Sequence, residues 1–377
     1  MFNLEICSWP PDDTFKAQWT DLFQKTSYNS PFNCLEWMEA GVSVYNDSSP
    51  IYPMRFTDEN GKLCGLGLLR LVYETGRFDT YRSLRTVDFN SQRITPLLTY
   101  DLETMKEAIN TLTFKFPQKV DSFDFYKLDS MDTNLDNLVK VLDKIQIPAK
   151  VVVFNEQPVI NLDTSWDEYL ARMSQGHRKR TRRYPRNMLK AFPDYRFIRL
   201  RGQDDFEEYG KELLRSQIFE VFHKSCQTEY VQVHGIDHIE KMKSFYEKIF
   251  NAYISKNMID ICLIFADEKI IAYDFNLIQD QILYMFSGAY DPDYFKWSPG
   301  STLLSESIKD SYERGDLRIE MGGDYLDYKS LWTKETINSY SMRLYGNSFK
   351  AKVKKWIQMS TFYQQFVQRK NQQISEK

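Results

Sequence analysis

The sequence lacks the features that mark secreted, membrane-spanning or zinc-binding proteins. Its five cysteines are scattered, odd in number and without a Cys-x-x-Cys pair, which argues against a disulfide framework or a structural zinc site and favours a reducing compartment. The N-terminus has no basic region followed by an apolar one, as a signal peptide would have. The apolar run 261–266 has the length of a strand, and no run approaches the length of a membrane span. We therefore expect a cytoplasmic protein that binds no metal and has no transmembrane segment.

The chain also lacks a large excess of charge of either sign. Its formal net charge is -3, so the whole chain is not an electrostatic nucleic-acid binder, and such a role would need a local basic patch. Hydrophobic residues make up 42% and aromatic residues 15%, which is enough for substantial cores. The length of 377 residues exceeds one ordinary domain, and two domains are therefore predicted.

Hydrophobic periodicity predicts alternating helices and strands along the chain. In the first half, helices are predicted at 13–25, 31–44, 102–114 and 135–145, and strands at 51–57, 63–73, 122–128 and 149–154. In the second half, helices are predicted at 204–224, 236–251, 301–314, 328–332 and 349–369, and strands at 195–200, 258–265, 270–278, 282–290, 317–321 and 339–345. A long helix begins after Ser165, with Glu168 placed for a capping box, and runs toward Lys190 with a kink or end at Pro185.

The two halves share one order of elements: two helices, a run of strands, a helix, a strand, a helix and a strand. This shared order predicts an internal duplication with a crossover near 154–163. We predict an α/β (α+β) fold with domains at 1–155 and 156–346, followed by a basic C-terminal helix and tail at 347–377.

Two segments of the second half have an unusual composition. Residues 319–332 place two glycines among carboxylates, a tyrosine, a lysine and a tryptophan where a strand ends. Residues 290–300 lead directly into the helix that precedes that strand. Glycines together with ionisable groups at a strand end are typical of a site, so both segments are candidates for one.

Several short motifs occur in a characteristic order in the second half. They are Ser165-Trp166, Tyr169-Leu170, the basic run 177–183, Gly288-Ala-Tyr-Asp291, Ser298-Pro-Gly300, Gly323-Asp324 and Tyr328-Lys-Ser-Leu-Trp332. With the element order, they resemble the GNAT superfamily of N-acyltransferases, and more closely its CelD-type, FemAB-like branch with tandem domains. The resemblance is strongest over 162–332 and weaker in the first half, where Ser30-Pro-Phe with Trp37, and Arg82-Ser-Leu84 followed by Pro96, are similar to the family.

The resemblance implies two tandem GNAT-like domains, each a mixed, mainly antiparallel sheet flanked by helices. The second domain would be catalytic. The first domain would complete the active-site cleft and would have no loop of its own that binds the acyl carrier. The implied activity is transfer of an acyl group, acetyl first, from acyl-CoA to an amine by direct attack. The acceptor would be a small-molecule or envelope-precursor amine, and the oligomeric state stays open.

One departure from the family pattern leaves the donor open. The superfamily loop Arg/Gln-x-x-Gly-x-Gly/Ala corresponds to 297–302, which keeps one glycine and has no leading Arg or Gln. FemAB-like relatives take their acyl group from aminoacyl-tRNA, so tRNA is an alternative partner. A third alternative is an inactive module that binds an anionic envelope precursor or a partner protein.

The segment Ser298-Pro-Gly300 opens a helix after a strand. A helix N-terminus offers free N–H groups and a positive dipole end to phosphates, and a glycine lets the backbone approach them closely. Alternatively, Ser298 is an ordinary N-cap followed by a first-turn proline. The predicted donor-binding residues are Tyr290, Ser298, Gly300, Ser301 and Thr302.

Amide formation from a thioester needs a base for the amine and benefits from an acid for the leaving thiolate. Tyr328 lies where many GNAT enzymes keep that acid. Asp324 is the predicted base, with Glu320 acting through a water as an alternative, and Lys329 is predicted to stabilise negative charge. In a purely structural interpretation, Asp324 caps the short helix and Lys329 forms an ion pair.

The basic helix has no acidic residue between Arg172 and Lys190. Arg178 and Arg182, with Trp332, are the predicted substrate-binding residues, and the substrate would be a phosphorylated sugar, a lipid phosphate or tRNA. The alternative is a solvated basic face. The C-terminal helix 349–369 either rests on a membrane surface or packs its Trp, Ile and Phe residues against the domain. His223 with Cys226, and His234 with His238, are interpreted as ordinary residues.

Overall fold

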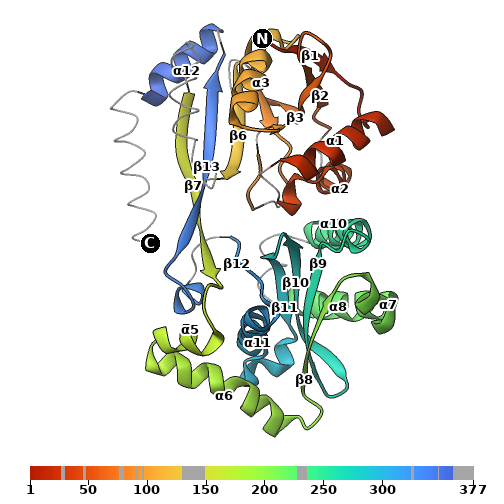
Figure 1. Cartoon of the computed structure of the whole chain (residues 1–377), viewed down its shortest axis with the longest axis vertical. Helices are drawn as coiled ribbons and strands as arrows, with labels where there is room; N and C mark the ends of the chain where they lie inside the picture. Colours follow the sequence, from red (N-terminus) through yellow and green to blue (C-terminus); the bar gives the residue numbers. More distant parts are fainter. Residues whose placement is uncertain are drawn as a thin grey trace. The chain divides into compact units, whose positions relative to one another are not determined.

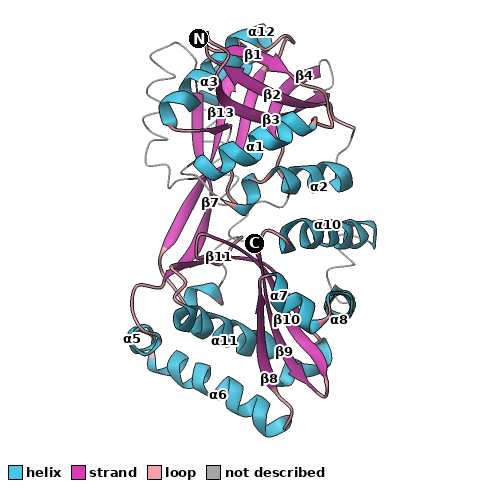
Figure 2. Ribbon diagram, turned by 45° about the vertical axis from the view of Figure 1, so that its right-hand side comes forward, coloured by secondary structure: helices cyan, strands magenta, loops and turns pink. Residues whose placement is uncertain are grey.

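The structure is a computed structural model that describes residues 1–26, 30–45, 48–75, 80–89, 92–95, 97–129, 149–226, 236–323, 327–346 and 348–359. These residues form two compact units. Unit 1 contains the described residues of Met1–Tyr28, Asn46–Phe154 and Ser339–Lys377, and unit 2 contains those of Asn29–Tyr45 and Asn155–Asn338. Figures 1 and 2 show the elements of each unit.

Unit 1 is a sheet with helices packed on it. Its strand order is β1-β2-β3-β4-β6-β13, in which β4 and β6 are parallel and the other neighbours antiparallel. The strands are β1 (Asn3–Ile6), β2 (Ile51–Thr57), β3 (Leu63–Thr75), β4 (Thr80–Thr86), β6 (Ser122–Asp129) and β13 (Thr336–Tyr345), which belongs to this unit from Ser339 onward, and β5 (Leu98–Thr99) pairs with β3. The helices are α1 (Asp13–Lys25), α3 (Leu102–Lys115) and α12 (Phe349–Met359). Apolar residues of β2, β3, β4 and β6 pack against α3 in the core.

Unit 2 repeats this plan. Its strand order is β8-β9-β10-β11-β12-β7, in which β11 and β12 alone are parallel. The strands are β7 (Ala149–Asn161), which belongs to this unit from Asn155 onward, β8 (Arg196–Arg201), β9 (Ile259–Ala266), β10 (Lys269–Gln279), β11 (Ile282–Tyr290) and β12 (Arg318–Glu320). The helices are α2 (Leu35–Tyr45), α5 (Trp166–Arg172), α6 (Gln175–Ala191), α7 (Gln203–Tyr209), α8 (Lys211–Cys226), α10 (Ile236–Ile254) and α11 (Pro299–Arg314), and the 3-10 turns are η1 (Pro31–Asn33), η2 (Pro292–Trp297) and η3 (Lys329–Leu331).

The two sheets place their parallel pair at the same point. Counted from β1 and from β8, four antiparallel strands are followed by a strand that runs parallel to the fourth. In each unit a helix, α3 or α11, connects the two parallel strands. The predicted α/β fold of two similar mixed sheets is confirmed by this repeated order.

The units group two segments differently from the linear division predicted at 155 and 346. Asn29–Tyr45 belongs to unit 2, where the Tyr253 hydroxyl donates to the Pro31 carbonyl at 2.6 Å. The Trp37 ring also meets the Phe245 ring edge-on, with centroids 4.9 Å apart. The segment that begins at Ser339 belongs to unit 1, where it pairs with β6. Both groupings depend on contacts between residues far apart in the sequence.

The prediction of one long helix from Ser165 toward Lys190, kinked or ended at Pro185, was wrong because the segment forms two helices. Ser165 does begin α5 with the predicted capping box, but that helix stops at Met173, whose backbone is extended. Ser174 then accepts a hydrogen bond from the His177 N–H at 3.2 Å and starts α6, which contains Pro185 in its interior. A second capping residue therefore divided the helix, and the proline did not.

Other element predictions were incomplete. The predicted helix 204–224 is two helices divided at Gly210, whose φ of 85° ends α7. Strands β1 and β4 and the turn η2 were not predicted, and strand β7 runs on to Asn161 through the predicted crossover. The predicted helix 135–145 lies outside the described residues.

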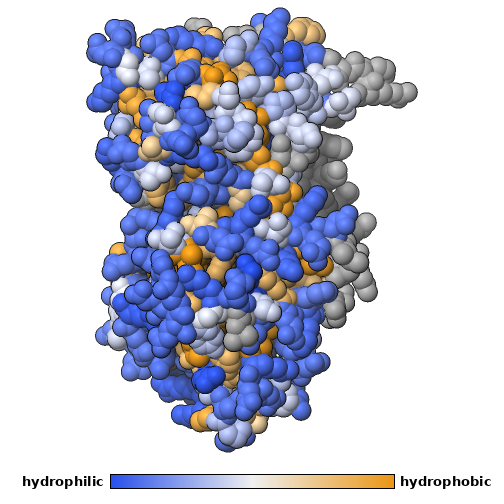
Figure 3. Space-filling model, turned by 90° about the vertical axis from the view of Figure 1, so that its right-hand side faces the viewer, coloured by the Kyte–Doolittle hydropathy of each residue, from blue (hydrophilic) through white to orange (hydrophobic). Residues whose placement is uncertain are grey.

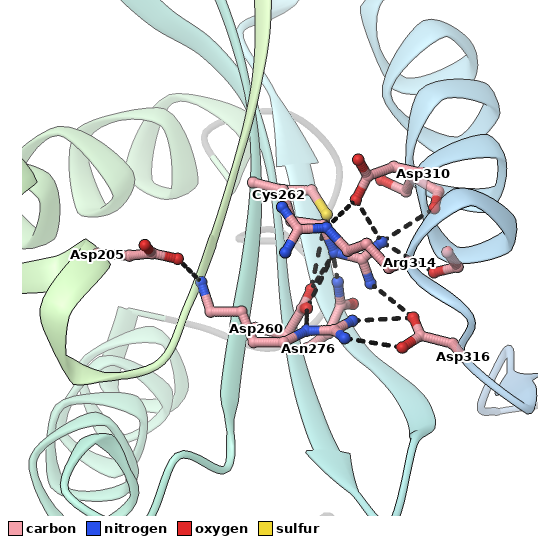
Figure 4. A network of polar contacts seen from close by, with 11 residues as sticks. Asp205, Asp260, Cys262, Asn276, Asp310, Arg314 and Asp316 are labelled. Atoms are coloured by element: carbon pink, nitrogen blue, oxygen red, sulfur yellow. Dashed lines mark hydrogen bonds and ion pairs between the residues drawn. The ribbon is translucent and has the colours of Figure 1, made fainter.

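A buried polar network ties α11 to β8 and β9 (Figure 4). The guanidinium of Arg199 donates to Asp260 at 2.9 Å and to Asp310 at 3.0 Å, while Arg201 bonds Asp260 and Asp316. Arg199 and Asp260 are both fully buried, and each keeps a second ion-pair partner, Asp310 for Arg199 and Arg201 for Asp260, so that their charges are compensated within the network. The network fixes the carboxyl half of α11 against the sheet, and with it the position of the helix start.

The surface in Figure 3 is mainly hydrophilic, with apolar side chains scattered in small groups. Within the described residues, no helix combines the length and apolar character needed to cross a membrane.

Candidate active site

The parallel strands β11 and β12 separate soon after they meet. They pair only through Ile282–Tyr284 and Arg318–Glu320. Strand β11 continues to Tyr290, and on its β12 side no further strand pairing is found in the described part of the chain. The backbone of 285–290 therefore presents N–H and C=O groups on one edge, where an extended ligand could bind.

A β-bulge changes the direction of β11 at the point where it separates from β12. The register against β10 shifts between Phe275 and Asn276, so that Phe286 is the extra residue. The Phe286 ring packs against Trp37 and Tyr246, with centroids 5.1 and 5.4 Å away. Bulges redirect the residues that follow them, and here Gly288 falls opposite Asp274 of β10.

Gly288 makes room for the Asp274 carboxylate. A Cβ added at Gly288 would lie 2.2 Å from Asp274 Oδ1, so only glycine allows this carboxylate to lie over β11. The carboxylate of the partly buried Asp274 forms no hydrogen bond or ion pair with any described residue. Burial and the charge of Asp260 raise its pKa to about 7, although Arg199 acts in the opposite direction. A carboxylate with such a pKa is suited to accept and release a proton near neutral pH.

Asp274 was not among the residues predicted from the sequence. The signal that could have found it is a pair of polar residues, Asp274 and Asn276, within the otherwise apolar strand β10. Such residues are usually buried for a reason, either a structural network or a chemical role. Only the pairing with β11 shows that Asp274 adjoins the open strand edge.

The start of α11 is an open helix N-terminus. Ser298 has a left-handed backbone (φ 59°, ψ 52°), and its side chain caps no N–H group. Pro299 has no N–H, and the Thr302 N–H is bonded to the Ser298 carbonyl at 3.0 Å. The N–H groups of Gly300 and Ser301 are left without an intrahelical partner, and the first turn carries no acidic residue. Ser298 therefore occupies the N-cap position without the side-chain hydrogen bond of an ordinary serine N-cap.

The predicted donor residues gather at this helix start. A Cβ added at Gly300 would lie 3.2 Å from Tyr290 Cδ1, so the glycine lets the Tyr290 ring pack against the first turn. Ser301 is exposed, whereas Thr302 is fully buried and donates its hydroxyl to the Ser298 carbonyl. Thr302 therefore shapes the turn with its side chain, and Gly300 and Ser301 supply the free N–H groups.

Tyr328 lies just before η3 with a half-exposed ring, 51% of which is accessible. Burial of its hydroxyl region and the charge of Asp274 raise its pKa above the ordinary value. The two groups are therefore near enough to interact electrostatically. Since the Tyr328 hydroxyl stays protonated at neutral pH and forms no hydrogen bond with a described residue, it is able to donate a proton.

The other predicted catalytic residues have structural contacts. The Lys329 ammonium is buried and donates to the Gly322 carbonyl, next to two glycines with positive φ, which stabilises the turn after β12. Glu320 is fully buried and accepts from Arg318 at 2.8 Å. Their catalytic roles stay predictions, and Asp324 lies outside the described residues.

The basic helix α6 has one buried and one basic face. His177, Thr181 and Met188 are buried, and His177 packs edge-on against Trp332 with centroids 4.5 Å apart. Trp332 is itself buried, and its carbonyl accepts from Tyr169 at 2.6 Å, so its described contacts are those of a core residue. Arg178 donates to the Ala171 carbonyl at 2.7 Å and links α6 to α5.

A stripe of five cations covers the outer face of α6. At about 100° per residue, they fall within one third of the helix circumference and extend along ~16 Å of its axis. None forms an ion pair with another described residue. The stripe consists of Lys179, Arg182, Arg183, Arg186 and Lys190. Arg182, predicted to bind substrate, is therefore exposed and available to an anion.

No group of three or more His, Cys, Asp or Glu side chains is arranged to hold a metal ion among the residues described. His234 lies outside them.

A comparison with known protein families gives a match in the second half of the chain. Residues 175–330 match the family model described as an acetyltransferase (GNAT) domain. The superfamily predicted from the sequence is thereby confirmed, and the predicted enzyme class, a GNAT-type acyltransferase, is confirmed through this domain. A search of curated proteins found no match.

Solved structures share the fold along most of the chain. A conserved protein of unknown function from Bacteroides thetaiotaomicron is 12% identical with a TM-score of 0.55, over 92% of this chain and 100% of that one. The structure of L-PGS from Bacillus licheniformis is 10% identical with a TM-score of 0.52, over 96% and 99%. The C-terminal domain of a putative lysylphosphatidylglycerol synthetase from Agrobacterium fabrum is 10% identical with a TM-score of 0.50, over 92% and 97%. At these identities the matches establish the fold.

Proposed function

We propose that this chain, in which residues 175–330 form a GNAT acyltransferase domain, transfers an acyl group from acyl-CoA to an amine. The observation that carries the proposal lies in unit 2. There, a link connects β11 to α11. At its α11 end lies the uncapped helix start with Gly300 and Ser301. At its β11 end the Asp274 carboxylate lies above Gly288. One end suits a phosphorylated carrier, and the other suits proton transfer.

The donor would be held by the backbone of α11. The N–H groups of Gly300 and Ser301 would donate to pyrophosphate oxygens, and the dipole of the helix would favour their negative charge. The edge of β11 would bond the extended part of the carrier. We propose acetyl-CoA as the first donor to test, because a GNAT domain generally uses an acyl-CoA.

The reaction would be direct transfer, with Asp274 as the base. Asp274 accepts a proton from the amine, whose nitrogen then forms a bond to the thioester carbonyl carbon. The carbon–sulfur bond breaks, the electron pair leaves with sulfur, and the Tyr328 hydroxyl donates its proton to the thiolate. The product is an amide and a free thiol, and the proton on Asp274 returns to the tyrosinate through solvent. Asp324 and Glu320 remain the alternative bases predicted from the sequence.

The acceptor would be an anionic molecule that carries an amine. The five-cation stripe of α6 has no acidic partner among the described residues, and α6 packs against α11 in the same unit. Phosphate or carboxylate groups of an acceptor would bind there, with Arg182 near the middle of the stripe.

Aminoacyl-tRNA is the second candidate donor. The α6 stripe would suit a polyanion, and one protein of the same fold is described as a putative lysylphosphatidylglycerol synthetase. The two donors differ in their response to salt, because release of counterions makes RNA binding fall steeply as salt rises.

The experiment is calorimetric titration of the full chain with acetyl-CoA, a longer acyl-CoA and charged tRNA at low and moderate salt. Mass spectrometry of the product from a panel of amines would accompany it. Binding of an acyl-CoA together with an acylated amine supports the proposal. Binding of tRNA alone would select the second donor, and the absence of binding by any of the three would overturn both candidates.

A further inference from the structure

The C-terminal helix α12 presents an apolar stripe to solvent. Phe349, Val353 and Trp356 have exposed fractions of 80%, 38% and 74%. Their spacing of four and then three residues places them on one side of the helix, within about 60° of arc. The stripe contains two aromatic side chains, whose exposure in a water-soluble setting is unfavourable.

The opposite side of α12 is the one that docks on unit 1. Ala351 is fully buried, and the Lys350 ammonium donates to the Thr80 carbonyl at 3.0 Å. The Lys354 ammonium pairs with Glu74 at 3.2 Å and lies 3.6 Å from the centre of the Tyr81 ring. Since these contacts hold the helix by its other face, the apolar stripe is turned outward by the docking itself. Figure 1 shows α12 among the elements of unit 1.

The two lysines that do not dock flank the stripe. Lys352 and Lys355 form no ion pair with any described residue, and on a helical wheel both lie on the same flank of Phe349 and Trp356. The helix contains no Asp or Glu, and none occurs in the sequence between Phe349 and Ser375. An acidic protein partner would satisfy the lysines alone. An anionic bilayer interface satisfies both the lysines and the exposed tryptophan and phenylalanine.

We propose that α12 is a membrane-surface helix, which lies in the plane of an anionic bilayer with Phe349, Val353 and Trp356 toward the acyl chains. Lys352 and Lys355 reach the lipid phosphates. The helix thus brings unit 1 to a lipid surface while Lys350 and Lys354 keep it attached to the sheet. This surface lies in unit 1 and is independent of the proposed acyl transfer.

The test is co-sedimentation of the full chain with vesicles of phosphatidylcholine, alone or mixed with phosphatidylglycerol. We expect binding to the mixed vesicles only. The pair Lys352→Gln and Lys355→Gln should weaken it by about fivefold per lysine. The pair Phe349→Gln and Trp356→Gln should weaken it by tenfold or more, on the order expected for lost burial of two aromatic side chains. The lysine effect should disappear at high salt, whereas the aromatic effect should persist.

Matched controls remove the same groups elsewhere. Lys241→Gln with Lys248→Gln takes two exposed lysines from α10, and Phe114→Gln takes a half-exposed phenylalanine (54%) from α3. Neither control should change binding, and every variant should keep the melting temperature of the wild type because the altered residues are exposed, apart from the half-buried Lys355, which forms no ion pair with a described residue. Equal losses in the controls, or no binding by the wild type, would overturn the proposal. A wild-type dimer that the aromatic pair turns into a monomer, without vesicle binding, would instead assign the stripe to a second copy of the chain.

Discussion

Each unit contains a parallel strand pair whose strands are connected by a helix. The two units differ in how that helix begins and in how the strand pair ends. In unit 1, Asp101 caps α3 by accepting from the Thr104 N–H at 2.8 Å, and Glu103 adds a second negative charge to the first turn. In unit 2, α11 begins with a left-handed Ser298 and has no side-chain cap and no acid in its first turn. One helix start is neutralised by its own sequence, and the other remains open to an external anion.

The parallel strand pairs of the two units also differ, and again the groups without a partner are those of unit 2. Strand β4 follows β3 without a register shift and ends at Thr86, and Asp124 beside it is held by Arg343 at 2.6 and 2.8 Å. Strand β11 has a bulge, extends beyond β12 and brings Gly288 beneath a carboxylate with no partner among the described residues. The two units therefore have similar sheets and connecting helices. The capping residue, the bulge and the ion pairs decide which unit is able to bind a ligand and react with it.

Asp274→Asn should produce the largest effect on activity. If Asp274 is the base, turnover should fall by roughly 10²–10³-fold, because general-base catalysis contributes that much. The wild-type rate should rise as pH increases through about 7, where the carboxyl loses its proton, and the variant should not show that rise. Steady-state rates measured across neutral pH check this. An unchanged profile in the variant would assign the proton transfer to Asp324 or Glu320.

The same variant should also be more stable. Since the pKa of Asp274 is about 7 in the folded protein and its ordinary value is 3.8, the folded state binds more protons between these pH values. Its stability therefore falls as pH rises through this window, and the full destabilisation is present above it. Asn should raise the unfolding free energy by roughly 2–4 kcal/mol above neutral pH and have little effect near pH 4. Denaturant unfolding at both pH values measures it, and equal effects at both would contradict the linkage.

Tyr328→Phe should lower turnover by roughly 10–10²-fold, since protonation of the leaving thiolate is a smaller requirement than activation of the amine. Stability should change little because the ring is half exposed. Single-turnover rates with donors of differing thiol acidity are the measurement, and the loss should be largest for the most basic thiolate. Unchanged turnover would remove Tyr328 from the chemistry.

Ser301→Asp would make the start of α11 resemble that of α3. A carboxylate at the first turn should weaken acyl-CoA binding by about tenfold through repulsion of the phosphates, while it slightly stabilises the helix. Ser301→Asn is the matched neutral control and should bind the donor as the wild type does. Calorimetric titration of both variants decides, and equal affinities would place the carrier elsewhere.

Asp101→Ala should show the smallest effect and complete the comparison. Loss of the α3 cap should reduce the unfolding free energy by about 1 kcal/mol. Donor affinity should not change, because unit 1 holds no carrier in this proposal. Thermal unfolding and the same titration test it, and weaker donor binding would show that unit 1 also contributes to the carrier site.

The sequence was sufficient for the general plan and for part of the site. Local signals identified the capping box at Ser165 and most strands of unit 2, because capping and apolar patterning act over a few residues. The motif Ser298-Pro-Gly300 marked the helix start, but its pattern also fits an ordinary N-cap. The left-handed backbone of Ser298, which only the structure shows, distinguishes the two.

Other features could not be predicted from local sequence patterns, because they depend on pairing between residues that are far apart in the sequence. Asp274 gains its position from the bulge at Phe286 and from the missing side chain of Gly288, which belong to another strand. The segment Asn29–Tyr45 lies in unit 2 because its aromatic residues pack against α10, more than 200 residues later in the chain.

The sequence by itself indicated the class of protein through the order of its elements, its glycine positions and the basic run of α6, and the match of residues 175–330 to a GNAT acetyltransferase domain agrees with that prediction. The tertiary structure decided which carboxylate adjoins the open strand edge, which helix start is free, and which side of α12 is exposed. These properties depend on the proximity and burial of residues that are distant in sequence, and local patterns contain no information about either.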